Sequence, residues 1–150
     1  MNAVSTRPRL TELVESIAVA SPMQARALTA AVAGLSAEEA NELEQYLWFC
    51  ADDGWDKERL VQAYLTITND TMREQVYFQR HGHYRYSSFD SVAASVYFDS
   101  DYMGRYMYGL ALTLYLWPNH LQLLRYFRRV LPSGRGGRYL EIGPGHGAFF

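Results

Sequence analysis

The feature that most restricts the fold is a set of three glycines at alternate positions, placed directly after a short apolar segment. Gly143, Gly145 and Gly147 follow residues 138–142 (Arg-Tyr-Leu-Glu-Ile), which read as a buried strand. Glycine permits positive φ and leaves no side chain to block a ligand. Residues 148–150 would open a helix, whose free N–H groups favour a carboxylate or phosphate. The pattern predicts a strand, a ligand-binding turn and a helix, as at the carboxyl end of a strand in an open α/β sheet.

A single strand of this kind needs neighbouring strands for its backbone hydrogen bonds. We therefore expect the natural protein to continue past Phe150, so that the 150 residues form the front part of a larger protein. The expected fold is mainly α, with a helical region over residues 1–135. Residues 136–150 would then begin an α/β domain with its first strand and glycine turn.

Helical periodicity and capping signals divide the region before the glycines into amphipathic segments. Ser21 with Gln24, and Ser36 with Glu39, have the spacing of capping boxes. The segment from Ser100 is apolar on most faces, which predicts a largely buried helix. The expected helices lie near residues 10–20, 22–34, 36–51, 56–79 (with a break favoured at 66–71), 88–98, 100–117 and 119–130.

The segment Glu141-Ile142-Gly143-Pro144-Gly145-His146-Gly147 resembles the first motif of the class I (Rossmann-like) methyltransferases that use S-adenosylmethionine. The resemblance implies a Rossmann-like α/β domain and methyl transfer to an O, N or C atom of a small molecule. It implies that Gly143, Gly145 and Gly147 bind the methionine part of the cofactor. Glu141 would help order the turn and reach the cofactor's ammonium group through water. The family's helical cover over the site would correspond to residues 90–131.

Other interpretations of the glycines remain open. Gly143, Gly145 and Ala148 also fit the Gly-x-Gly-x-x-Ala fingerprint of dinucleotide-binding proteins. An acid at Glu141 and the long helical region before the motif favour the methyltransferase. A non-enzymatic alternative is a helical interaction or dimerisation module with a structural glycine turn. We expect little catalysis from the 150 residues alone, because most of a cofactor pocket would lie beyond them.

Tyrosines and histidines supply the other candidate site residues. Tyr102 and Tyr106, one helical turn apart, could form a lid over substrate or cofactor by cation–π attraction, or could be core residues. His120, at a helix start, is the candidate general base, with capping or packing as the alternative. His146 occupies a variable position of the turn and could touch the cofactor. No metal site is expected, because the sequence offers no ligand cluster of suitable spacing.

Charge and cysteine content narrow the partners and the compartment. The net charge of −2 argues against nucleic acid as a partner, although five arginines between 125 and 138 form a basic stretch. The only cysteine, Cys50, fits a reducing cytoplasm. The longest apolar run, 106–117, is shorter than the roughly 20 residues of a membrane helix. The N-terminal helices could form a homodimer.

Overall fold

The computed structural model describes residues 7–131, 138, 140–143 and 145–147, and 79% of this part of the chain is helical. None of its helices is long and apolar enough to span a membrane. The elements are α1 (Pro8–Ala20), α2 (Pro22–Ala33), α3 (Ala37–Asp52), α4 (Lys57–His81), α5 (Phe89–Val92), the π-helical turn η1 (Ala93–Tyr97), α6 (Ser100–Leu116) and α7 (Pro118–Val130). These bounds agree with the sequence predictions to within a few residues, except that α4 continues without a break through 66–71.

The strand predicted over residues 138–142 does not form in the described part of this segment. Residues 138 and 140–142 lie in neither a helix nor a strand. Leu140 and Ile142, which a sheet would bury, are 83% and 91% exposed. An extended segment is stable only when a partner pairs its N–H and C=O groups, and the described residues contain no second strand. The prediction that a helical region leads into the first strand of a Rossmann-like α/β domain is therefore wrong for this part of the chain. The expected domain boundary at 135 and the helix start at 148–150 lie outside the described residues.

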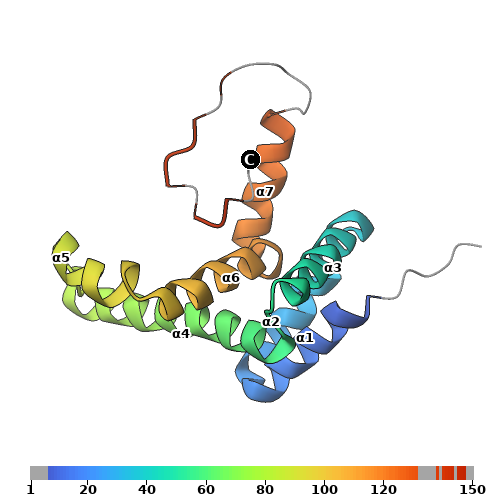
Figure 1. Cartoon of the computed structure of the whole chain (residues 1–150), viewed down its shortest axis with the longest axis horizontal. Coiled ribbons are helices and arrows are strands. Elements are labelled where there is room, and N and C mark those ends of the chain that lie inside the picture. Colours follow the sequence, from blue (N-terminus) through green and yellow to red (C-terminus); the bar gives the residue numbers. More distant parts are fainter. Residues whose placement is uncertain (1–6, 132–137, 139, 144, 148–150) are drawn as a thin grey trace, which may run out of the picture.

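The hydrophobic core lies where α1, α2 and α3 meet the first half of α4 and the second half of α6 (Figure 1). Full burial of such side chains contributes about 1.5–3 kcal/mol each. The largest hydrophobic side chains that are almost completely shielded from solvent are Leu13, Ile17, Leu28, Leu43, Leu47, Cys50, Tyr64 and Leu112. Every one comes from a helix, so the core needs no sheet.

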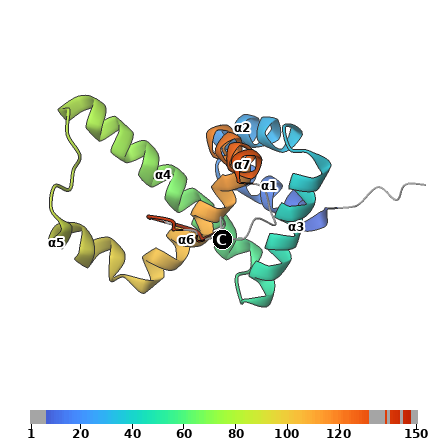
Figure 2. The ribbon, with the colours of Figure 1, turned by 90° about the horizontal axis from the view of Figure 1, so that it is seen from above.

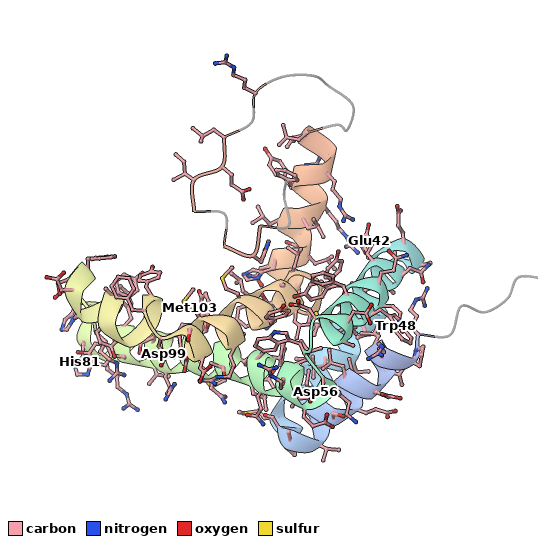
Figure 3. All side chains as sticks on the ribbon, in the orientation of Figure 1. Glu42, Trp48, Asp56, His81, Asp99 and Met103 are labelled. Carbon is pink, nitrogen blue, oxygen red and sulfur yellow. The ribbon has the colours of Figure 1, made fainter. Side chains whose placement is uncertain are left out.

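Helices α4 and α6 lie side by side and run in opposite directions (Figure 1). Beyond their contact, the C-terminal part of α4 and the α5–η1 segment separate, with residues 82–88 connecting them (Figure 2). His81 and Asp99 lie toward this open end (Figure 3). Aromatic side chains there are largely exposed, including Phe89 at 67% and Phe98 at 77%. The first half of α6 is thus only partly buried, whereas its second half crosses the core.

Arginines of α7 attach that helix to α3. The Arg125 guanidinium donates to both oxygens of Glu39 at 2.7 Å and to the Gly34 carbonyl at 2.9 Å. Arg128 donates to Glu42 at 2.9 Å, and Glu42 lies where α3 faces α7 (Figure 3). The hydrogen bond from Arg125 lowers the pKa of Glu39 to about 2. Two arginines of the basic stretch therefore stabilise the fold through acids of the same chain.

The capping signals have different outcomes. Ser36 accepts from the Glu39 backbone N–H, and the Glu39 carboxylate accepts from the Ser36 N–H, so that the predicted capping box is present. Ser21 makes no side-chain cap, although α2 begins at Pro22 as expected. Helix α6 is capped by Asp99, whereas the sequence suggested Ser100 or Asp101 as the cap.

Candidate functional site

The three alternate glycines all have positive φ, with values of +70° at Gly143, +55° at Gly145 and +67° at Gly147. This backbone conformation is strained for residues that carry a Cβ. At Gly145 a Cβ would also lie 3.1 Å from Cδ2 of Leu110, on α6. We call residues 141–147 the glycine segment. At Gly145 it contacts α6 by its bare backbone, in a conformation that only glycine adopts easily.

A cavity of about 270 Å³ lies between α3, α6 and the glycine segment. We call it the α3–α6 cavity. Helix α3 contributes two aromatic rings, α6 contributes apolar and tyrosine side chains, and the glycine segment contributes one imidazole. The lining residues are Tyr46, Phe49, Met107, Tyr108, Ala111, Leu114, Tyr115 and His146.

Two of the tyrosine hydroxyls of the cavity wall are held by carboxylates of α3 or of its C-terminal cap. Tyr108 donates to Asp53, and its ring stacks on Trp55 with centroids 3.9 Å apart. Tyr115 donates to Glu42 at 3.1 Å. Burial, together with these carboxylates, raises the pKa of Tyr108 and of Tyr115 to about 12. Both side chains are therefore neutral phenols at physiological pH.

His146 is half-buried at the edge of the cavity. Burial lowers the pKa of its imidazole; the nearby Glu141 carboxylate opposes this effect and His120 adds to it. The ring is therefore neutral near pH 7.

His120, the base predicted from the sequence, lies in the first turn of α7. Its Nδ1 is 2.9 Å from Oγ1 of Thr113, and its ring is 5.0 Å from that of Trp117. Thr113 gives its single hydroxyl proton to the Leu110 carbonyl at 2.6 Å. Its oxygen can therefore only accept from His120, which fixes the proton on Nδ1. His120 does not line the α3–α6 cavity, and its role as a base stays a prediction.

Glu141 has an unsatisfied carboxylate oxygen. Its Oε2 is shielded from solvent and has no hydrogen-bond partner among the described residues. A buried acceptor without a donor costs free energy, on the order of 1–3 kcal/mol, unless a ligand or ordered water supplies one. This oxygen can accept a hydrogen bond from a ligand that carries an ammonium group.

Tyr102 and Tyr106 do not line the α3–α6 cavity. Their rings stack 6.1 Å apart, and the Tyr102 hydroxyl donates to Asp70 of α4 at 2.6 Å. They line a different cavity of about 620 Å³, at the open end of the α4–α6 pair. At roughly 100° of rotation per residue, they face away from Met107 and Ala111 on the same helix. The structure thus does not bring this pair to the glycine segment, and their role as a lid stays a prediction.

Sequence reasoning did not single out most of the cavity wall. Tyr46 and Phe49 have the i, i+3 spacing of neighbours on one helix face, and Phe49 is 59% exposed. Nothing in their local sequence distinguishes them from ordinary core residues. Their association with Met107 and His146 depends on how α3 packs against α6, which spacing along the chain does not encode.

No protein-family model, curated protein or solved structure matches the chain. The assignment of a function to this site therefore rests on the glycine segment, on Glu141 and on the adjacent cavity.

Proposed function

We propose that this protein binds S-adenosylmethionine at residues 141–147 and transfers its methyl group to an O, N or C atom of a small molecule. The observation that supports the proposal is the left-handed conformation of Gly143, Gly145 and Gly147 directly after Glu141. The proposal depends on this turn and on the buried oxygen of Glu141, and requires no strand at 138–142.

In this proposal the chain's own groups bind and orient the cofactor. The Glu141 carboxylate accepts a hydrogen bond from the cofactor's ammonium group, which would satisfy its buried Oε2. The bare Gly143, Gly145 and Gly147 allow the methionine part to approach the backbone. The bound cofactor supplies a methyl group on a positively charged sulfur, and the protein accelerates transfer mainly by holding acceptor and methyl group in line.

Calorimetric titration of the complete product of the open reading frame with S-adenosylmethionine tests the proposal. Gly145→Val places a side chain at a strained φ and against Leu110, so cofactor binding should be lost. Gly82→Val is the matched control, because Gly82 also has a positive φ of +71° but has nothing within 4 Å of an added Cβ. Binding of a nicotinamide dinucleotide instead of S-adenosylmethionine would reject the methyltransferase in favour of the dinucleotide alternative.

A second candidate is a helical interaction module that acts as a homodimer. It is favoured by apolar side chains exposed near the α1–α2 junction, where Val19 is 83% and Met23 is 73% exposed. Light scattering coupled to size-exclusion chromatography tests it: a monomer at micromolar concentration would reject the dimer. Retention of that dimer in Gly145→Val, together with absent cofactor binding by the parent protein, would favour this module over the enzyme.

We further propose a cytoplasmic location and a small-molecule partner. Cys50 is a buried free thiol, as is common in a reducing compartment. Arg125 and Arg128 are paired with Glu39 and Glu42, which offsets the charges that a nucleic acid would need.

A further inference from the structure

The cavity at the open end of the α4–α6 pair shares no lining residue with the α3–α6 cavity (Figure 2). Its volume of about 620 Å³ falls within the range of about 300–1,000 Å³ that is typical of small-molecule sites. We call it the aromatic cavity, because aromatic rings and carboxylates dominate its wall. These side chains are Asp70, Glu74, Phe78, Tyr84, Tyr102 and Tyr106.

The four rings form two pairs that belong to different segments of the chain. On α6 the rings of Tyr102 and Tyr106 stack with their centroids 6.1 Å apart. Phe78 of α4 and Tyr84 of the connecting segment 82–88 have ring centroids 4.9 Å apart, and they are 42% and 70% exposed. The face of an aromatic ring carries partial negative charge and attracts cations. The cavity therefore offers ring faces to a cation from two parts of the structure.

The carboxylates of Asp70 and Glu74 add negative charge to the same wall. Asp70 accepts hydrogen bonds from the Tyr102 hydroxyl at 2.6 Å and from Arg73, and Glu74 accepts from Arg85 at 3.0 Å. Both arginines line a neighbouring cavity, and neither Lys nor Arg is among the described residues that line the aromatic cavity. The charge that faces the aromatic cavity is therefore negative.

The hydrogen bonds already made by Asp70 distinguish between classes of cation. Each of its two oxygens accepts a hydrogen bond within the chain. A primary ammonium or a guanidinium needs acceptors for its N–H groups when it leaves water. A quaternary ammonium has no N–H group, and ring faces alone can attract its charge. The wall therefore favours a fully methylated ammonium over a cation that must donate hydrogen bonds.

We propose that the aromatic cavity binds the trimethylammonium group of a small organic cation between the rings of α4, of the 82–88 segment and of α6. The site is separate from the glycine segment and does not depend on the proposed function. It gives Tyr102 and Tyr106 the cation–π role that the sequence predicts for them, with a cation other than the methyl donor.

The ligand class is tested by calorimetric titration of the complete protein with choline. Choline should show saturable binding. Its neutral isostere 3,3-dimethyl-1-butanol has the same shape without the charge and should bind about tenfold more weakly or worse. Ethanolamine, which keeps the charge and adds N–H donors, should also bind about tenfold more weakly. Equal affinities for choline and the neutral isostere would show that apolar contact alone accounts for binding, and would overturn the inference.

The role of the rings is tested by two changes at one position. Tyr106→Phe keeps the ring and should bind choline within a few-fold of the parent affinity. Tyr106→Leu keeps an apolar side chain without a ring and should weaken binding about tenfold. Tyr126→Leu removes an exposed tyrosine of α7 and should leave the Kd of choline unchanged. If Tyr106→Leu lowers the urea midpoint, Phe78→Leu repeats the test at a more exposed ring; unchanged choline binding in both leucine variants would contradict the site.

Two further measurements separate this site from the glycine segment and from a lipid. Gly145→Val should not change the Kd of choline, because Gly145 does not line the aromatic cavity; loss of choline binding in this variant would place the cation at the glycine segment. Retention of the protein on phosphatidylcholine vesicles, reversed by free choline, would place the trimethylammonium group on a lipid and reject a small-molecule ligand. Binding of S-adenosylmethionine without choline rejects this inference alone, and binding of choline without S-adenosylmethionine rejects the proposed function alone.

Discussion

Gly109 of α6 packs directly on the backbone carbonyl of Ala63 in α4. A Cβ built on Gly109 would lie 2.3 Å from that carbonyl oxygen, a distance that no real contact reaches. The two helices therefore approach so closely that only a glycine fits at their crossing. This contact fixes α6 against α4, and with it the position of Met107 and Ala111 in the cavity wall.

Gly109→Ala should destabilise the protein by roughly 2 kcal/mol or more, because the backbone of α4 must move to admit one methyl group. Urea denaturation followed by circular dichroism measures the change. Gly104→Ala is the matched control on the same helix, since its Cβ would meet only the Trp55 side chain at 3.2 Å. Both variants gain the same helix propensity, about 1 kcal/mol. The control should stay within about 1 kcal/mol of the parent; equal effects of the two would show that the Ala63 contact does not govern packing.

The positions of the helices are the part of the fold that the local sequence determines, whereas the contact between Gly109 and Ala63 depends on packing. Helix positions follow from apolar spacing and from signals such as Ser36 with Glu39, which act within a few residues. The strand at 138–142 was predicted from an equally local pattern, but a strand requires a partner elsewhere in the chain. Leu140 and Ile142 meet none in the described residues and remain exposed.

The candidate site also has a part that the local sequence indicates and a part that only the packing of the helices brings together. The alternate glycines and Glu141 can be identified from the sequence, because they lie within one short segment and glycine is the residue that adopts positive φ easily. The cavity next to them combines Phe49 of α3 with Met107 of α6, and the packing of the helices sets this association. Tyr106, adjacent to Met107 in sequence, faces another cavity because neighbours on a helix diverge by about 100°.

The ion pair between Glu39 and Arg125 should make the fold sensitive to acid. The pKa of the Glu39 carboxyl is about 2 in the folded protein, below its ordinary value of 4.5. The stabilisation is therefore complete above about pH 4.5 and is lost as the pH falls toward 2. Urea midpoints measured across this range should decline in the parent protein and decline less in Glu39→Gln, whose amide still accepts from the Ser36 N–H. Near pH 7 the same variant should be less stable by about 2 kcal/mol.

Glu38→Gln is the control for the acid prediction, because Glu38 is the exposed acid next in sequence. It removes the same charge from the first turn of α3 without touching Arg125. An acid transition that Glu38→Gln flattens as strongly as Glu39→Gln would attribute the effect to general charge and not to the ion pair.

Tyr108 and Tyr115 should make the fold sensitive to alkali as well. Their folded-state pKa of about 12 lies above the ordinary value of 10. The stabilisation is therefore complete below pH 10 and is lost as the pH rises through 12. Tyrosinate absorbance should place both phenols among those that ionise late in the native protein and near pH 10 in guanidinium chloride. One late phenol should disappear in Tyr108→Phe and one in Tyr115→Phe; a native titration curve identical to the unfolded one would contradict the contacts with Asp53 and Glu42.

Cys50 should be chemically inert in the native protein. Its side chain is completely shielded from solvent in the core, and burial raises the pKa of its thiol to about 11. Since the thiolate is the reactive form, a chromogenic disulfide reagent should modify the native chain at pH 8 at least about 100-fold more slowly than the chain in guanidinium chloride. Gly109→Ala should accelerate modification, because loosening α6 against α4 opens the core in which Cys50 packs with Leu112. Rapid modification of the native parent would mean that α3 separates from α6 readily in solution, and that the α3–α6 cavity opens with it.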